Sequence, residues 1–252
     1  MNVLAEPFGD PQLFISYAPM YWGAGTQEKN VMQPRKSLIV AFGLLLIVGV
    51  AEVYAQQYEV TVTNLTRGQQ FTPLLVASHK GNVRIFTLGS PASSELRTLA
   101  EEGNTAPLMA VLSANADYKQ VVTVPGLLDP GKSATTKVNA DGADFLTVAA
   151  MLIPTNDAFL ALNGVRIPRG SETIDLYVTA YDSGTERNDE LCASIPGPNF
   201  AECGGPGKGG APGGGEGFVH VHEGIHGVGD LKPALRDWKN PVALISVRRI
   251  RN

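Results

Sequence analysis

The sequence is poor in the features that several protein classes require. It has 20 Lys and Arg residues against 24 Asp and Glu, so it lacks the basic excess of a nucleic-acid-binding protein. It has two cysteines and no Gly-x-Ser-x-Gly motif, which argues against a hydrolase with a serine or cysteine nucleophile. The apolar run over 38–51 has about 14 residues, fewer than the roughly 20 that span a membrane. Binding and structural modules therefore remain the leading classes.

The N-terminal region carries the pattern of a secretory signal. A basic pair, Arg35 and Lys36, precedes the apolar run 38–51, and small residues follow it up to Ala55. This order of segments is typical of a signal peptide. We therefore predict a signal peptide over 32–55 with cleavage after Ala55, and a retained membrane anchor is the alternative.

The rest of the chain divides around that signal. Residues 1–31 show no clear periodicity, so we predict that they are a non-native extension and that Met32 is the true start. No cysteine stands at the expected cleavage point, so a lipid anchor is not indicated. Removing the first 55 residues leaves 17 basic and 20 acidic residues (20 − 3 and 24 − 4), a net charge near −3. We expect 56–252 to be one secreted domain, extracellular or periplasmic, without a stable membrane anchor or a nucleic-acid partner.

The two cysteines, Cys192 and Cys203, lie eleven positions apart. In an exported protein such a pair is most simply a disulfide. Closing this loop is expected to stabilise the fold by somewhat less than about 3 kcal/mol, the figure for a 15-residue loop. A metal-binding pair is the alternative, although the spacing matches no zinc motif.

Most of 56–252 has the periodicity of β-strands. Residues 58–65 alternate apolar and polar side chains, and 72–79 form a continuous apolar run that suits a strand buried on both faces. One short helix is expected between Ser93 and Asn104, from a serine cap, apolar residues at helical spacing and a terminal glycine. Further strand-like segments cover 118–126, 132–139, 145–154, 158–168, 172–182 and 240–250.

This pattern predicts an all-β fold, an antiparallel β-sandwich with one short helix. Gly, Pro, Asn and Asp separate the strand-like segments, as expected of turns. The glycine-rich stretch 204–218 cannot contribute a core, so we expect a long, mobile surface loop there.

Acidic residues concentrate where one predicted strand ends, in Tyr181–Leu191. Asp182 lies at the end of the strand, and a turn at Gly184 brings Glu186 back towards it. The strand-like run 145–154 is followed in the same way by Asp157. Three carboxylates held together repel one another unless a cation lies between them, and Ca²⁺ prefers such oxygen ligands. A solvated acidic turn without an ion is the alternative.

Five segments together resemble the spondin N-terminal domain, the module shared by F-spondin and mindin and found in secreted bacterial proteins. They are 58–79, 95–108, 150–165, 178–193 and 240–250. The resemblance implies an antiparallel β-sandwich that binds calcium through Asp157, Asp182 and Glu186. Two differences from the family pattern stand out: no Trp follows Asp157, and the third acid is Glu instead of Asp.

Three of the four histidines lie close together, at His220, His222 and His226. Two alternating histidines on a strand point to the same side, and a third could fold back to complete a nitrogen site for zinc or copper. The alternative is that these residues only line a loop, because Glu223 sits between them and no downstream acid follows at the expected spacing.

The sequence thus supports three hypotheses. The first is a secreted, non-enzymatic, calcium-binding spondin-like module that recognises an extracellular surface or matrix ligand, as the resemblance implies. The second is a metalloprotein or metalloenzyme that uses His220, His222 and His226. The third is a structural module without a bound ion.

Overall fold

We describe a computed structural model of the chain, in which most of the predicted mature domain is defined. The described residues are 56–81, 83–140, 143, 145–207, 209–210 and 214–250. The predicted extension 1–31 and the signal peptide 32–55 lie outside them. Within the described residues, no helix is long and apolar enough to cross a membrane.

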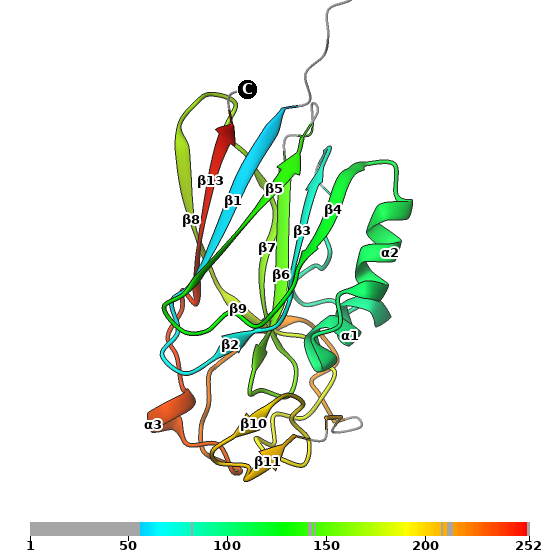
Figure 1. Ribbon diagram of the computed structural model, residues 1–252. Helices are drawn as coiled ribbons and strands as arrows, with labels where there is room; N and C mark the ends of the chain where they lie inside the picture. The colour runs from blue at the N-terminus through cyan, green and yellow to red at the C-terminus, as the bar shows by residue number, and fades with distance from the viewer. Residues whose placement is uncertain are drawn as a thin grey trace, which may run out of the picture. The chain divides into compact units, whose positions relative to one another are not determined.

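Two antiparallel sheets form a sandwich (Figure 1). The first has the order β5-β1-β13-β8 and consists of β1 (Gln57–Asn64), β5 (Ser133–Asn139), β8 (Thr173–Val178) and β13 (Ala243–Ile250). The second has the order β12-β9-β7-β6-β3-β4 and consists of β3 (Leu74–His79), β4 (Tyr118–Val124), β6 (Phe145–Ile153), β7 (Ala158–Arg166), β9 (Ala180–Asp182) and β12 (His220–Val221). The prediction of an all-β antiparallel sandwich is confirmed.

Three smaller elements complete the β structure. Strand β2 (Gln70–Phe71) pairs with β6, and β10 (Asn199–Phe200) forms a separate ribbon with β11 (Gly205–Pro206). The ribbon lies beyond one end of the sandwich, together with the short helix α3 (Pro233–Arg236) (Figure 1).

The predicted helix is present as α1 (Ser94–Glu102). The Ser93 side chain accepts a hydrogen bond from the backbone N–H of Leu96, and Gly103 ends the helix in a left-handed conformation (φ 66°). A second helix, α2 (Ala106–Ala114), follows directly. It was not expected, because its apolar residues do not form one clear helical stripe, and only Leu108 and Leu112 are buried.

The core has two parts because β3 is covered on both faces. Alternate residues of β1 are buried, and they meet Leu74 and Val76 of β3 inside the sandwich. Leu75 of β3 faces the other way and packs against Leu96 and Leu99 of α1. The continuous apolar run at 72–79 thus reflects burial by a sheet on one side and helices on the other, as expected of a strand buried on both faces.

The strand predicted over 172–182 is divided between the two sheets. Its first part, β8, pairs with β13, whereas its second part, β9, pairs with β7. The alternation of buried positions continues through the break, so Val178 and Ala180 both face the core. Alternation alone therefore does not reveal that the chain changes sheets at Thr179.

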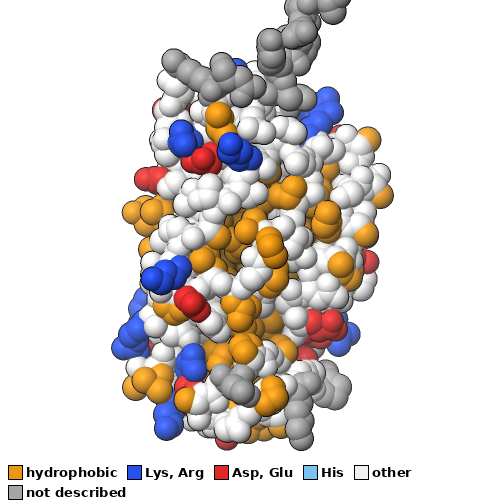
Figure 2. Space-filling model, in the orientation of Figure 1, with side chains coloured by type: hydrophobic (Ala, Val, Ile, Leu, Met, Phe, Trp, Pro, Cys, Tyr) orange, Lys and Arg blue, Asp and Glu red, His pale blue; other side chains and the backbone are white. Residues whose placement is uncertain are grey.

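The edge strands β4 and β5 carry apolar side chains that are only partly covered. Val122, Val124 and Ala134 pack against the sandwich core while remaining partly exposed. Figure 2 shows hydrophobic side chains along the middle of this face, over β5 and the neighbouring strands of the second sheet. In this view, the charged side chains lie around this band of hydrophobic side chains, towards the margins of the face.

Candidate metal centre

The antiparallel pairing of the second sheet brings the predicted acidic residues to one end of the sandwich. Asp157 immediately precedes β7, and Asp182 is the last residue of β9. Because these strands run antiparallel with Ala158 opposite Asp182, the start of β7 and the end of β9 coincide. On the other side of β9, His220 of β12 lies opposite the same Asp182.

Asp157 is fully buried, with 0% of its surface exposed. Its Oδ2 accepts hydrogen bonds from the Ser183 hydroxyl (2.8 Å) and from the backbone N–H groups of Thr185 (2.8 Å) and Glu186 (3.1 Å). Its Oδ1 is buried without a hydrogen-bond partner among the described residues. Burial, with the Asp182 carboxylate beside it, raises the pKa of Asp157 to about 6. Asp157 therefore has one well-satisfied oxygen and one that needs a partner.

Asp182 is also fully buried. Its Oδ1 accepts from the Gly184 backbone N–H at 2.7 Å, and its Oδ2 accepts from Nδ2 of Asn188 at 2.6 Å. Burial raises the pKa of Asp182, and the two hydrogen bonds oppose that effect. A carboxylate offers about four lone-pair positions, so two remain for another ligand.

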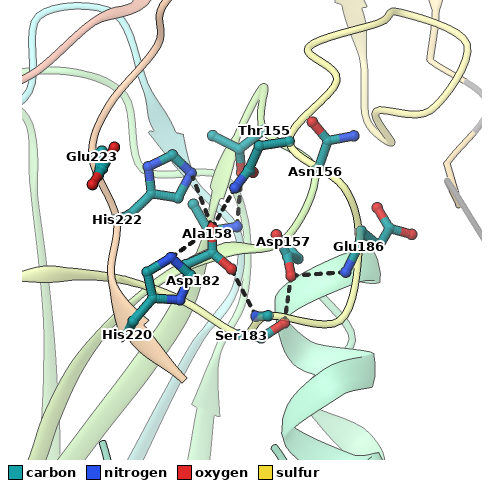
Figure 3. Close-up of polar contacts among 12 residues, drawn as sticks. Thr155, Asn156, Asp157, Ala158, Asp182, Ser183, Glu186, His220, His222 and Glu223 are labelled. Atoms are coloured by element: carbon teal, nitrogen blue, oxygen red, sulfur yellow. Dashed lines mark hydrogen bonds and ion pairs between the residues drawn. The ribbon is translucent and has the colours of Figure 1, made fainter. Parts of the chain in front are cut away.

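Glu186 contacts Asp157 through its backbone and not through its side chain. Its N–H donates to Asp157, while its carboxyl group points away from Asp157 and Asp182 (Figure 3). The side chain is buried, 1% exposed, and lies within electrostatic reach of Arg97 on α1. Of the three predicted calcium ligands, the structure thus brings two carboxylates together and directs the third elsewhere.

Two other acids of the stretch Tyr181–Leu191 hold loops together. The Asp189 carboxylate accepts from side chains and backbone of its surroundings, including Nδ2 of Asn156 at 3.0 Å. Glu190 accepts three backbone N–H groups, from His226 (2.6 Å), Gly227 (2.7 Å) and Val228 (3.0 Å). Two of the acidic side chains at this turn are therefore used as acceptors for loop groups, and a hydrogen bond to an ionised carboxylate is stronger than one between neutral groups.

The three histidines have different environments. His220 and His222 place Nε2 at 3.9 and 3.8 Å from Oδ2 of Asp182 (Figure 3). His226 is exposed, and its Nε2 lies 4.0 Å from the Glu223 carboxylate. Among the described residues these three imidazoles do not form a group of ligand atoms around one point.

His222 is enclosed, with 5% of its surface exposed, and its ring lies 5.0 Å from that of Trp238. Its Nδ1 accepts a hydrogen bond from the Gly224 backbone N–H at 2.9 Å, so the neutral ring carries its proton on Nε2. Burial lowers the pKa of His222 to about 4, and the ring is neutral at pH 7.

Part of the glycine-rich stretch docks onto the acidic turn. The N–H of Gly217 donates to the Gly184 carbonyl at 2.8 Å, and Gly214 forms a β-bridge with Glu186. Gly184 adopts φ 69°, and a Cβ there would lie 2.3 Å from the Phe218 carbonyl oxygen. Residues 214–218 thus lie at the surface, as expected of this stretch, but they are held on the acidic turn by backbone contacts.

This docking brings in an acid that the sequence did not single out. Atoms of Asp182, Glu216 and His220 that can bind a metal all lie within 4.8 Å of one another. Glu216 was missed because it is a lone acid in a stretch with no regular periodicity. Its position four residues before His220 was the only signal in the sequence.

The disulfide between Cys192 and Cys203 is present, with a Cα–Cα distance of 5.3 Å. It closes the segment that carries β10 onto the end of the acidic stretch. The bidentate pair between Arg236 and Glu202 (both 2.8 Å) then links the same segment to α3. The loops at this end of the sandwich are therefore tied to one another.

Comparison with known proteins decides the family. The Spondin_N family model, that of the spondin N-terminal domain, matches residues 50–194, more than half of the chain. The chain belongs to the spondin N-terminal domain family. No curated protein matches the sequence.

Membership of the spondin family, with the disulfide, indicates an extracellular type of module. The matched range contains Asp157, Asp182 and Glu186, and it ends before Glu216 and His220. The resemblance noted from the sequence is thus confirmed over 50–194. Strand β13 lies after that range and completes the first sheet, because it pairs with both β1 and β8.

Proposed function

We propose that this protein is a secreted, non-enzymatic spondin module that binds one calcium ion at Asp157 and Asp182 and presents its loops to an extracellular surface or matrix ligand. The observation that carries the proposal is the pair of fully buried neighbouring carboxylates, one with an unpartnered oxygen. Two buried anions side by side are costly unless a positive charge lies between them.

The residues present fit calcium. Oδ1 of Asp157 offers a buried oxygen without a partner, and Asp182 keeps lone pairs beyond its two hydrogen bonds. Calcium accepts six to eight oxygens in flexible geometry, so water and backbone carbonyls can supply the remainder. Glu186 would join the site through a change of side-chain rotamer, because its backbone already lies against Asp157.

The ion would act structurally. It would neutralise the carboxylates and fix the turn Ser183–Glu186, to which the segment 214–218 is docked. The loops held by Glu190 belong to the same end of the sandwich, so a bound ion would rigidify a surface built from several segments. Recognition of an extracellular ligand is then expected to depend on calcium.

The test is thermal unfolding of the full protein in chelator, in CaCl₂ and in MgCl₂. At a hundredfold excess over the dissociation constant, calcium is expected to stabilise the fold by about 2.7 kcal/mol. For a domain of this size that corresponds to a rise in Tm of about 5–10 °C. Asp157→Asn should abolish the rise, because the amide keeps the shape of the carboxyl and removes its charge. An equal rise in the wild type and in Asp157→Asn would contradict the proposal.

A second function, catalysis at a site formed by His220, His222 and His226, is not favoured. His226 faces Glu223 at the surface, and Nδ1 of His222 is engaged by the Gly224 N–H. The three imidazoles therefore do not offer three lone pairs to one ion.

A further inference from the structure

We propose that Asp182, Glu216 and His220 form a second site, for a divalent transition metal of the zinc class, that shares only Asp182 with the calcium site. The three residues offer one nitrogen and two oxygen ligands, all within 4.8 Å of one another. The site goes beyond the proposed calcium module, because Glu216 and His220 lie outside the range that matches the spondin family.

His220 is oriented for metal binding by its second nitrogen. Its Nδ1 lies 3.2 Å from the Phe218 carbonyl oxygen, which can only accept a hydrogen bond, so Nδ1 carries the proton. In the neutral ring, Nε2 then carries a lone pair, and this nitrogen lies 3.9 Å from Oδ2 of Asp182. Metal-binding histidines are commonly fixed in this way, with the other ring nitrogen donating to a carbonyl or carboxylate.

Two acceptors that face each other need a positive charge between them. The nitrogen lone pair of His220 and the Asp182 carboxylate cannot hydrogen-bond to each other, and Glu216 adds a second negative group. A divalent cation would balance the two carboxylates and use the imidazole as its third ligand. An imidazole ligand favours zinc and similar metals over calcium, which prefers oxygen alone.

The distance between His220 and Asp182 is close to that between two ligands of a bound ion. Two ligand atoms of a tetrahedral zinc ion lie about 3.3 Å apart when each bond is about 2.0–2.1 Å. The Nε2–Oδ2 distance of 3.9 Å is within about 1 Å of this value. Glu216 is exposed and can move to close the rest, whereas Asp182 is fixed by Gly184 and Asn188.

His222 differs from His220 in which ring nitrogen carries the proton. Its Nδ1 accepts the Gly224 N–H, so Nε2 points a proton towards Oδ2 of Asp182 at 3.8 Å. Because Nε2 carries this proton, His222 offers no lone pair to an ion at Asp182 and is not a ligand of the proposed site. Three protein ligands leave a fourth position for water or an external group, as in open zinc sites.

The backbone explains why these residues meet. Register pairing of β12 with β9 places His220 directly opposite Asp182, and the docking of Gly217 on Gly184 carries Glu216 to the same side. The site thus depends on strand pairing and on a turn that tolerates no side chain at Gly184.

The test is zinc binding by the full protein purified without a polyhistidine tag, measured by competition with a chromophoric chelator. We expect one zinc ion per chain. His220→Gln and Glu216→Gln should each weaken zinc binding by about 100-fold or more. Removing a residue that only supports a metal ligand already weakens binding by about 10- to 100-fold, and these two residues would bind the metal directly. His226→Gln is the matched control and should leave the affinity unchanged, because His226 lies with Glu223 away from the site.

Cobalt provides a second readout, since visible absorption bands of bound Co²⁺ should disappear in His220→Gln. Unfolding curves in chelator must coincide for wild type and Glu216→Gln, whose side chain is exposed. Failure of the wild type to bind zinc, binding unaffected by both ligand variants, or equal loss in His226→Gln would overturn the site.

The zinc and calcium proposals share Asp182 and are separated by the other ligands. Asp157→Asn should lose calcium binding and keep zinc, whereas His220→Gln should lose zinc and keep calcium. Absence of calcium binding in the wild type would leave the zinc site standing, provided that zinc binding still depended on Glu216 and His220.

Discussion

Replacing Asp157 by Asn is expected to change how stability depends on pH in calcium-free protein. Burial and the Asp182 carboxylate raise the pKa of Asp157 to about 6, from an ordinary value of 3.8. Burial lowers the pKa of His222 to about 4, from 6.5. Both residues are buried, and they lie at the same end of the sandwich, where the Asp157 charge acts on His222.

The two groups act in opposite directions. The stability that comes from Asp157 is fully present below pH 4 and is lost as the pH rises through about 6, because the folded state holds this proton more tightly. The stability that comes from His222 is fully present above pH 6.5 and is lost as the pH falls towards 4, because only the unfolded state takes up that proton easily. At about 1.4 kcal/mol per pH unit, each contribution amounts to about 3 kcal/mol. Between pH 4 and 6 they nearly cancel.

Asp157→Asn removes one of these opposing contributions. The free energy of unfolding of the variant, relative to wild type, should fall by about 3 kcal/mol between pH 6.5 and pH 4. Urea unfolding in chelator, followed by tryptophan fluorescence, measures this difference at each pH. The His226→Gln protein is the control, since its side chain is exposed. Parallel pH profiles for wild type and Asp157→Asn would show that Asp157 does not hold its proton more tightly in the folded state.

Three further predictions concern the loops at this end of the sandwich. Gly184→Ala should lower the free energy of unfolding by about 1–3 kcal/mol in urea titrations, because φ is 69° and the new Cβ has no space; an unchanged midpoint would contradict the described docking. Glu190→Ala should cost about 1.5–3 kcal/mol by removing hydrogen bonds from loop N–H groups to a charged acceptor, whereas Glu223→Ala, at an exposed position, should be neutral in the same titration. Replacing Cys192 and Cys203 by Ser should cost less than about 3 kcal/mol, and a larger loss would show that the disulfide does more than close a loop.

The sequence predicted those parts of the fold that depend on local patterns. The alternation in β1, the uninterrupted apolar run of β3 and the caps of α1 at Ser93 and Gly103 each have a direct cause in burial or backbone geometry. The break at Thr179 was not predictable in this way, because side-chain alternation is the same whether a strand continues in one sheet or crosses to the other.

The acidic turn was predicted in part. The convergence of Asp157 with Asp182 followed from two strand ends with a third strand between them, and the structure has that arrangement. The Glu186 carboxyl group instead points away from Asp157 and Asp182, towards surroundings that include the charge of Arg97, which is remote in sequence. The spacing of the acidic residues also could not reveal that Glu190 accepts hydrogen bonds from backbone N–H groups more than thirty residues away.

The histidines illustrate a limit of a different kind. His220 and His222 alternate on one segment and look equivalent in the sequence. Their chemistry differs because one Nδ1 donates to the Phe218 carbonyl and the other accepts from the Gly224 N–H. Such differences depend on backbone groups that carry no sequence signal, so only the folded structure distinguishes His220, with Nε2 free to bind a metal, from His222, with Nε2 protonated.

The buried Asp157–Asp182 pair is expected to be completed by a calcium ion. Isothermal titration calorimetry of chelator-treated protein with CaCl₂ tests it most directly. We expect one calcium ion per chain for the wild type and no binding by Asp157→Asn. Absence of calcium binding by the folded wild type, or equal binding by both proteins, would contradict it.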